Sequence, residues 1–543
     1  MKSTASSRWI SAAFLCAVLG AFLVLVIRYQ RRPTILELNK LKATPGDQIE
    51  IRGKAFGRGM DSSKLLIGSF SLSLASILEW EDNRILAKVP HNDGTVFVKV
   101  ETRFGLSNGV IFGDEDLFPE IEYGPWLPGA AYIKYAEPQN LRIGELITLH
   151  GEGFENKRGS GRIWVNSRDK LLRLGAEEPD LSLYIEARNI GKWTENVVQF
   201  WIPEGASSGN IYLQKGAKFS NPFSVELIED AGEILQGEAF HWSLRQKIAI
   251  AEVSSTPQNA LYLHIPSPLP GIGQGEAVVL DAYSEKPYSP ISVRGNLNLY
   301  RVDNLGNGES VNINRQIFLK THSVEVNIHR ETPYHPSHPE IVAALAQDEW
   351  VKPNLVASLG SSLVANRQGN WFKSKDIYNY VISKFSFDEN SKGQSVAEYI
   401  SSDFADSLGY SLLFTSIARA AGVPARPVGG ILVLDNLSTR PWWWSEIWIN
   451  GIGWVPVDSA LGDSSIKLVE LEENPADYYF GALEGRHIAF SRGILNSSAL
   501  QPNPRLRRKE EIFTLQGVYE ELSGNLESYR SNWPVPEVTK VRR

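Results

Sequence analysis

The sequence predicts a multidomain chain: an N-terminal transmembrane helix, two all-β sandwiches, a further β-sandwich domain and an α+β core. Three observations support this fold class: an uncharged apolar segment near the N-terminus, a repeated glycine pattern, and a change from alternating to helical apolar spacing. At 543 residues the chain is too long for one hydrophobic core. The expected boundaries are 1–33 for the anchor, 34–114 and 130–228 for the two sandwiches, 232–345 for the further β-rich domain, 346–495 for the core and 496–543 for a C-terminal extension.

Charge and cysteine content exclude several classes of function. The chain has 55 basic and 62 acidic residues, whereas nucleic-acid binders normally show a basic excess, so we expect no nucleic-acid partner. Its single cysteine, Cys16, excludes disulfides within the chain and metal sites built from several thiolates. His335 and His338 stand in the stretch HPSHP, whose prolines favour a loop over a metal site. We therefore expect no metal and no other cofactor.

The apolar segment 10–27, ISAAFLCAVLGAFLVLVI, is 18 residues long and carries no charge. A membrane-spanning helix needs about 20 residues. Trp9 and Tyr29 stand at its ends, where amphipathic rings favour the membrane interface. A cleaved signal peptide is the alternative, but no small-residue cleavage pattern follows. We therefore expect an uncleaved anchor.

The orientation of this anchor depends on two conflicting signals. The positive-inside rule, applied to the three arginines after the segment, would place the body in the cytoplasm. The absence of thiols from the body, and the β-sandwich modules that follow the anchor, favour the extracytoplasmic side. We expect a single-pass protein of a bacterial cytoplasmic (inner) membrane, with its body in the periplasm or extracytoplasmic space.

Two stretches 98 residues apart share a pattern. PGDQIEIRGKAFG (45–57) matches IGELITLHGEGFE (143–155), and Trp80 recurs 113 residues later as Trp193. The second copy therefore carries 113 − 98 = 15 extra residues, which we place within 166–190. Apolar residues alternate in each copy, as they do in short antiparallel strands. The pattern G-x-x-I-x-I-x-G-x-x-F, followed by W-x9-P, resembles the IPT/TIG immunoglobulin-like domain, which implies a spacer or adhesive unit.

Residues 232–345 alternate again and predict a third β-sandwich, after which helical spacing begins. The clearest helix covers 408–421, with Asp406 and Ser407 as N-cap candidates and the stop signal GVP after it. VGGILVL and WWWSEIWI follow as predicted strands. Asn450-Gly451 then predicts a type I′ hairpin turn before GWVPVD.

This order of elements resembles the α+β core of the transglutaminase-like (papain-like) superfamily. In that family a cysteine starts the helix, and an H-x-W-x-E strand and a G-W-x-x-x-D strand follow. RAAGVPAR (419–426) matches the run after the helix, and Trp444 with Glu446 matches the aromatic strand. GWVPVD (453–458) matches the last motif. The resemblance covers about residues 235–540 and implies thiol-dependent acyl transfer.

Two of the three positions that this resemblance assigns to catalysis hold unsuitable residues. Ser407 stands at the cysteine position, Trp442 at the histidine position and Asp458 at the third position. A serine hydroxyl must lose its proton to a base, and an indole nitrogen donates a hydrogen bond but accepts none. Ser407 also suits a helix N-cap. An alternative base is His487, the nearest histidine in sequence within the same domain, although GRHIAF is typical of a strand rather than a catalytic loop.

The stretch RPWWWSEIWIN (440–450) indicates what fills this site. Alternate side chains of a strand share a face, which groups Trp442, Trp444, Glu446 and Trp448 against Trp443 and Ser445.

The predicted hairpin places Asp458 across from about Trp442–Trp443, so Trp442 occupies the space of the missing imidazole. We expect Trp442 to plug the cleft, with the other tryptophans packed as core. A ligand platform that stacks a sugar is the alternative. Trp444, Glu446 and Tyr410 are the candidates for the cleft lining.

We therefore expect a membrane-anchored extracytoplasmic protein whose transglutaminase-like domain is inactive and acts as a scaffold or binding module of the cell envelope. Its expected partners are the membrane, through the N-terminal helix, and another envelope protein or a peptidoglycan or glycan ligand. Two alternatives stay open. One is a serine-dependent hydrolase or acyltransferase that uses Ser407, and the other is a glycan-binding module that uses exposed rings on the Trp442 face.

Overall fold

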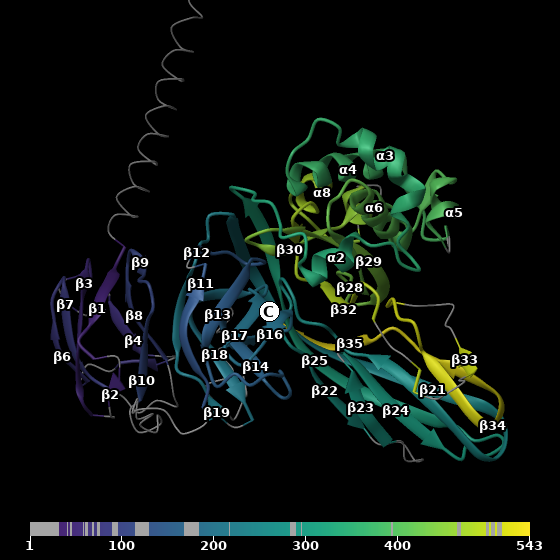
Figure 1. The fold of residues 1–543 in the computed structure, drawn as a ribbon, viewed down its shortest axis with the longest axis horizontal. Helices are drawn as coiled ribbons and strands as arrows, with labels where there is room; N and C mark the ends of the chain where they lie inside the picture. Colours follow the sequence, from purple (N-terminus) through teal and green to yellow (C-terminus); the bar gives the residue numbers. More distant parts are fainter. Residues whose placement is uncertain are drawn as a thin grey trace, which may run out of the picture. The chain divides into compact units, whose positions relative to one another are not determined.

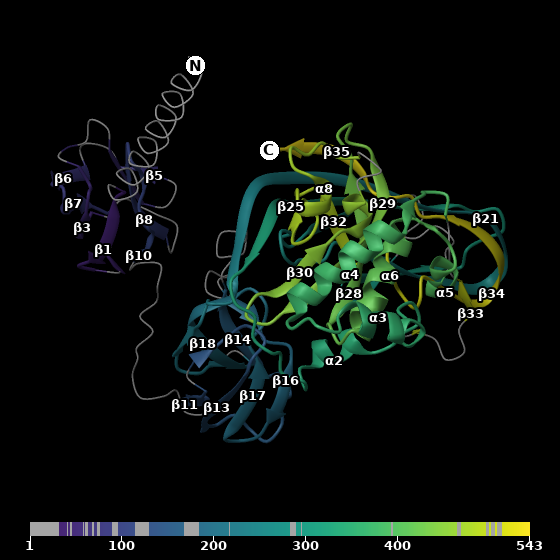
Figure 2. The ribbon, with the colours of Figure 1, turned by 90° about the horizontal axis from the view of Figure 1, so that it is seen from above.

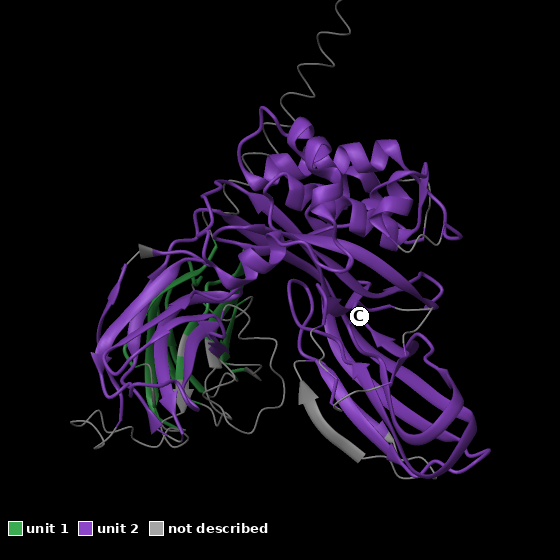
Figure 3. Cartoon of the chain, turned by 45° about the vertical axis from the view of Figure 1, so that its right-hand side comes forward, with its two compact units in different colours: residues 1–126 green, residues 127–543 purple. Residues whose placement is uncertain are grey.

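The structure is a computed structural model that describes residues 32–543 apart from 41, 44–45, 58, 60–62, 68–69, 73–75, 90–95, 115–129, 139, 168–183, 217, 283–288, 295, 392–394, 464–467, 496–498, 501–504 and 508–512. It divides into two compact units, residues 1–126 and 127–543 (Figure 3). In the described part, no helix is both long and apolar enough to cross a membrane. The predicted anchor over 10–27 lies outside the described residues.

The first unit contains a β-sandwich (Figure 1). Buried residues alternate along its strands, as they do in β3. One sheet has the order β1-β3-β7-β6, and the other has the order β2-β10-β8-β4-β5 with β9 beside β8. Side chains from both sheets form one buried core. The strands are β1 (Thr34–Leu38), β2 (Lys42–Ala43), β3 (Gln48–Lys54), β4 (Lys64–Ile67), β5 (Phe70–Ser71), β6 (Ile77–Trp80), β7 (Arg84–Lys88), β8 (Val96–Thr102), β9 (Gly105–Leu106) and β10 (Val110–Asp114).

The second unit begins with a sandwich of the same topology. Its sheets have the orders β11-β13-β17-β16 and β12-β20-β18-β14-β15, with β19 beside β18, which match the first sandwich strand for strand. Much of the predicted insertion, 168–183, lies between β14 and β15 and outside the described residues. The strands are β11 (Tyr132–Glu137), β12 (Asn140–Leu141), β13 (Leu146–Glu152), β14 (Arg162–Ser167), β15 (Tyr184–Glu186), β16 (Ile190–Trp193), β17 (Val197–Trp201), β18 (Ala206–Lys215), β19 (Lys218–Phe219) and β20 (Phe223–Leu227).

The repeated residues make the same contacts in both sandwiches. Trp193 Nε1 donates to the carbonyl oxygen of Phe154 at 2.9 Å, and the Asn221 amide pairs with both backbone groups of Ile133. Gly151 is required because a Cβ there would meet the Tyr132 carbonyl oxygen at 1.9 Å. The corresponding residues of the first sandwich are Trp80, Phe56, Asn108, Ile35 and Gly53. The sequence repeat therefore records hydrogen bonds and close contacts, not only alternation.

The third β region, predicted as a β-sandwich, is one continuous nine-stranded sheet. It is continuous because β21 (Gly232–Pro266) and β25 (Val311–Ile328) are long strands that run through both of its core clusters. The predicted C-terminal extension supplies β33 (Arg505–Arg507), β34 (Glu520–Asn532) and β35 (Glu537–Arg542), and the last two pair directly with β21. The remaining strands are β22 (Val278–Ala282), β23 (Ser289–Arg294), β24 (Leu297–Asp303) and β31 (Ala482–Leu483).

The α+β core has a four-stranded sheet of order β30-β29-β28-β32 with helices packed against it (Figure 2). Helix α6 (Ser407–Ala420) is almost wholly buried and lies against β29 (Thr439–Ile449). The other strands of the sheet are β28 (Ala425–Val433), β30 (Gly453–Val457) and β32 (His487–Arg492). The remaining elements are α2 (Pro339–Leu345), η5 (Pro353–Val356), α3 (Ala357–Leu363), α4 (Asn370–Lys384), β26 (Ser386–Phe387), α5 (Val396–Ile400), β27 (Phe404–Ala405), α7 (Ser459–Gly462) and α8 (Pro475–Tyr478).

The hairpin between β29 and β30 corrects the predicted turn. Ile449 pairs with Gly453, so the loop has three residues instead of two. Gly451 has a φ of +87°, but Asn450 does not have the positive φ that a type I′ turn requires. The extra loop residue shifts the register by one, and Ser445 lies opposite Val457.

The second sandwich and the α+β core share an apolar seam. Trp448 and Trp454 of the core belong to the buried cluster of the sandwich, and their rings meet edge to face at 5.4 Å. His338, at the N-cap of α2, contacts the ring of Trp201 on β17 at 5.5 Å. In the sandwich repeat, Leu146 pairs with Trp201 where the first copy pairs Gln48 with Lys88. Only the second copy therefore offers apolar residues at this position.

Two equivalent glycines test the seam. Gly46 and Gly144 have φ values of +97° and +85°, so replacing either one by alanine strains the backbone in the same way. A Cβ on Gly144 would also meet the Trp448 ring at 2.6 Å, whereas a Cβ on Gly46 meets nothing within 4 Å. We expect Gly144→Ala to lower the free energy of unfolding by about 1–3 kcal/mol more than Gly46→Ala. Urea unfolding of the two variants measures this difference, and equal losses would contradict the tight seam.

Candidate functional site

The N-terminus of α6 is capped by Asp406 rather than by Ser407. The Asp406 carboxylate accepts from Gly409 N at 2.9 Å and from the Tyr399 hydroxyl at 2.7 Å. Ser407 is the first helical residue and is 6% exposed. The N-cap interpretation of Ser407 is therefore wrong by one position, because Asp406 already supplies the capping oxygen.

Helix α6 is held to β29 by hydroxyl groups. Ser411 Oγ donates to the Trp444 carbonyl oxygen at 2.5 Å, and the hydroxyls of Thr415 and Ser445 are 3.1 Å apart. Ser445 therefore faces the helix, while Glu446 faces the opposite way toward a pair of arginines. This alternation agrees with the strand faces that the sequence predicts.

Asp458 is fully buried and has a hydrogen-bond partner for each oxygen. Its Oδ1 caps α7 by accepting from Ala460 N and Leu461 N, each at 2.9 Å. Its Oδ2 accepts from Trp442 Nε1 at 2.7 Å and lies 2.9 Å from His487 Nε2. The Oδ2 atom of Asp458 therefore accepts a hydrogen bond from the Trp442 indole. The same oxygen also contacts the imidazole of His487, which belongs to a different strand.

His487 on β32 lies between two carboxylates. Its Nε2 contacts Asp458, its Nδ1 is 3.0 Å from Glu484 Oε1, and its ring stands edge to face on Trp444. Burial alone would lower the pKa of His487, but the charges of Glu484 and Asp458 and the hydrogen bonds to them outweigh burial and raise the pKa to about 9. The ring is therefore an imidazolium at neutral pH, with a proton on each nitrogen.

This charge state bears on the alternative in which His487 serves Ser407 as a base. An imidazolium has no free lone pair to accept the serine proton. In the described part of the chain, no hydrogen bond joins the Ser407 side chain to His487 or to Asp458. The structure brings Trp442, Asp458 and His487 together and leaves Ser407 outside this group of contacts.

The tryptophans of β29 belong to the core. Trp442, Trp443, Trp444 and Trp448 are 1%, 4%, 2% and 1% exposed. The Trp442 ring packs against Phe387 with centroids 5.7 Å apart. A sugar platform needs rings that face solvent, so these rings do not meet the condition for glycan binding on the Trp442 face.

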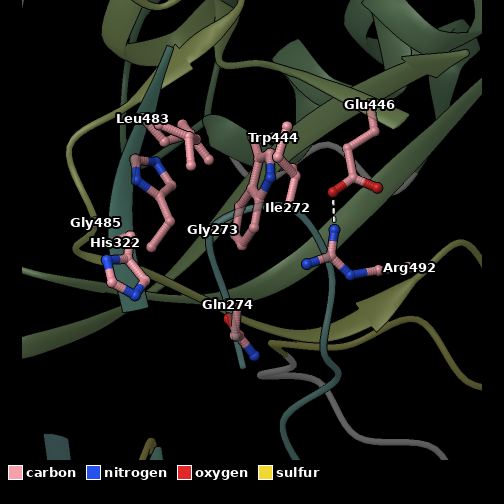
Figure 4. A pocket seen from close by; sticks show the side chains of 11 residues that line it. Ile272, Gly273, Gln274, His322, Trp444, Glu446, Leu483, Gly485 and Arg492 are labelled. Carbon is pink, nitrogen blue, oxygen red and sulfur yellow. Dashed lines mark ion pairs between the residues drawn. The ribbon is translucent and has the colours of Figure 1, made fainter. Parts of the chain in front are cut away.

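The three predicted lining residues have different positions. Trp444 and Glu446 line a small cavity beside His487 and Arg492 (Figure 4). Tyr410 is not among the lining residues. It is fully buried, and its hydroxyl donates to the Phe385 carbonyl oxygen at 2.9 Å and contacts Asp463 at 2.8 Å. Tyr410 is therefore a core residue, because its position on the helix points it into the domain.

Glu446 belongs to a buried charged cluster that reaches the second sandwich. One carboxylate oxygen accepts from Arg426 Nε at 2.7 Å, and the other pairs with Arg492 (Figure 4). The Arg426 guanidinium lies 3.9 Å from the centroid of the Trp454 ring, and Trp454 N donates to Glu204 Oε1 at 3.1 Å. Burial lowers the pKa of both guanidinium groups and raises the pKa of Glu204. The motif glutamate therefore serves the seam between sandwich and core.

Sequence reasoning missed Glu484 and Arg492 and considered His487 only as a partner of Ser407. Glu484 precedes His487 by three residues, and Arg492 ends the same strand. The available signal for these residues was an acidic residue before an apolar strand-like run and a basic residue at its end. The sequence could not show that β32 lies beside β28, because 53 residues (434–486) separate the two strands.

The charge of His487 predicts a pH dependence of stability. Its folded-state pKa of about 9 lies above the ordinary value of 6.5, so its contribution is complete below pH 6.5 and is lost as the pH rises through 9. We expect the free energy of unfolding to fall across this window by at most about 1.4 kcal/mol per pH unit. His487→Gln should remove that slope, whereas His241→Gln, at an exposed position, should retain it. Urea unfolding from pH 6 to pH 9 measures the slope, and identical slopes in all three proteins would contradict an imidazolium.

Comparison with known proteins agrees with the fold of the core. Residues 357–459 match the family described as the transglutaminase-like superfamily. Among curated proteins, no sequence matches this chain. A structure from Cytophaga hutchinsonii, described as a candidate cysteine protease, is 12% identical with a TM-score of 0.39, covering 57% of this chain and 92% of its own. The periplasmic domain of TgpA from Pseudomonas aeruginosa is 13% identical with a TM-score of 0.23, covering 43% of this chain and 88% of its own. From the matched residues, the chain carries a domain of the transglutaminase-like superfamily.

Proposed function

We propose that the transglutaminase-like domain is non-catalytic and works as a scaffold or binding module. The observation that carries this proposal is that both carboxylate oxygens of Asp458 already have hydrogen-bond partners. Its Oδ2 is hydrogen-bonded to the Trp442 indole and to the His487 imidazolium, and neither of these two rings has a free lone pair that could take the proton of a nucleophile. The motifs of the fold are present, but Trp442 stands at the position that the resemblance assigns to the proton-accepting histidine.

The chemistry of acyl transfer supports this proposal. A serine nucleophile needs a base within hydrogen-bonding reach, in turn oriented by a third group. The Trp442 nitrogen is a donor only, and it already donates to Asp458. Ser407 is buried at the first turn of α6, directly after the N-cap residue Asp406. These residues favour a packed domain over a serine-dependent hydrolase.

We also propose that the protein is anchored in a bacterial cytoplasmic membrane by residues 10–27, with its body on the extracytoplasmic side. The uncharged length of this segment and the absence of thiols after Cys16 support this arrangement. Its partner would then be another envelope protein or a peptidoglycan or glycan ligand. Such a ligand would bind elsewhere than on the buried tryptophans of β29.

A fluorophosphonate probe tests the absence of a serine nucleophile. We expect no adduct on Ser407 of the full-length chain, because neither the Trp442 indole nor the His487 imidazolium can remove the hydroxyl proton. Peptide mass spectrometry compares the wild type with Ser407→Ala. An adduct at Ser407, or amine incorporation into a glutamine peptide that Ser407→Ala abolishes, would overturn the proposal.

Rebuilding the triad tests the assignment of Trp442. In a Cys16→Ala background, Ser407→Cys introduces a single thiol without a neighbouring base. Adding Trp442→His places an imidazole beside Asp458, where it can hold the thiol proton. We expect the thiol of the double variant to titrate at least one pH unit lower than that of the single variant. The pH dependence of iodoacetamide alkylation measures both, and an equally low midpoint in the single variant would reveal another base.

A further inference from the structure

A small enclosed space lies between the sheet of the core and the loop before β22. Its walls include Trp444, Glu446, His487 and Arg492 from the core and Gln274 from the loop (Figure 4). About 10 Å³ is open to the centre of a water-sized sphere, which is room for one such molecule. The cavity is therefore a site for a single small occupant.

Some of the polar atoms on this wall have no hydrogen-bond partner among the described residues. In the described part of the chain, Trp444 Nε1 and Arg492 Nε have no hydrogen-bond acceptor. Trp444 is 2% exposed, and the Arg492 side chain is 8% exposed. Glu446 Oε1 makes no hydrogen bond there beyond its ion pair with Arg492. Native proteins rarely leave buried donors unmatched, so this concentration at one cavity requires an explanation.

We infer that this cavity binds one ordered water molecule, which accepts from Trp444 Nε1 and Arg492 Nε and donates to Glu446 Oε1. The wall chemistry selects water over other occupants. A cation would meet the Arg492 guanidinium and an indole N–H, and an anion would lie against the Glu446 carboxylate. An apolar molecule would leave the donors unmatched. Water supplies both an acceptor and a donor, and bridges of this kind are part of native structures.

This water joins two parts of the domain. Trp444 stands on the ring of His487, which contacts Asp458. Glu446 holds Arg426 at the seam with the second sandwich. The water therefore closes a polar bridge between the degenerate triad and the interdomain seam. It does not depend on whether the domain is catalytic.

Two measurements on the full-length chain test this site. A crystal structure at a resolution that places waters should show one density peak within hydrogen-bonding distance of Trp444 Nε1. In the indole N–H spectrum of the protein labelled on its 15 tryptophans, the Trp444 signal should exchange magnetisation with water. Trp444→Phe assigns that signal by removing it.

The matched control is Trp443→Phe, which removes a neighbouring buried indole that does not line the cavity. It should delete a different signal and leave the water contact of Trp444 intact. An empty cavity in the density, together with no magnetisation transfer to the Trp444 indole, would overturn the inference. A density peak with metal-like or halide-like scattering would overturn it as well.

Discussion

The fold of the C-terminal domain depends on how the buried carboxylate of Asp458 is satisfied. An isolated charge in a protein interior is very costly, and hydrogen bonds to each oxygen compensate for that cost. Two backbone N–H groups of α7, the Trp442 indole and the His487 ring share this task. These four groups leave both oxygens of the carboxylate with partners in the folded chain.

A second buried network extends from this site to the neighbouring sandwich. Glu446 pairs with two arginines, and one of them lies on the ring of Trp454 at the seam. Removing one member would leave an uncompensated charge in the interior, so the members of the network are interdependent. Glu446 and Trp454, which match the family motifs, therefore hold the second sandwich to the core. This role does not require the thiol and imidazole that the resemblance implies at positions 407 and 442.

The sequence predicted the sandwiches and the core because their signals are local. Alternation, the glycines of the repeat and the run RAAGVPAR are read within a few residues, and the repeat fixed two copies of one topology. The hairpin turn was wrong because the number of loop residues is set by strand pairing rather than by the Asn-Gly dipeptide alone. The C-terminal extension was left without partners, since its pairing with β21 joins residues nearly 300 positions apart, as in Arg245 with Glu537.

For the candidate site, the sequence by itself determined which chemistry is missing: a serine and an indole replace the thiol and the imidazole that the resemblance implies. It also placed Asp458 close to Trp442, because the predicted hairpin brings their two strands together. Only the tertiary structure decided that His487 meets the same carboxylate and that Glu484 keeps its ring charged. The contact of His487 with Asp458 joins residues 29 positions apart, and the charge of a buried imidazole depends on the carboxylates packed around it.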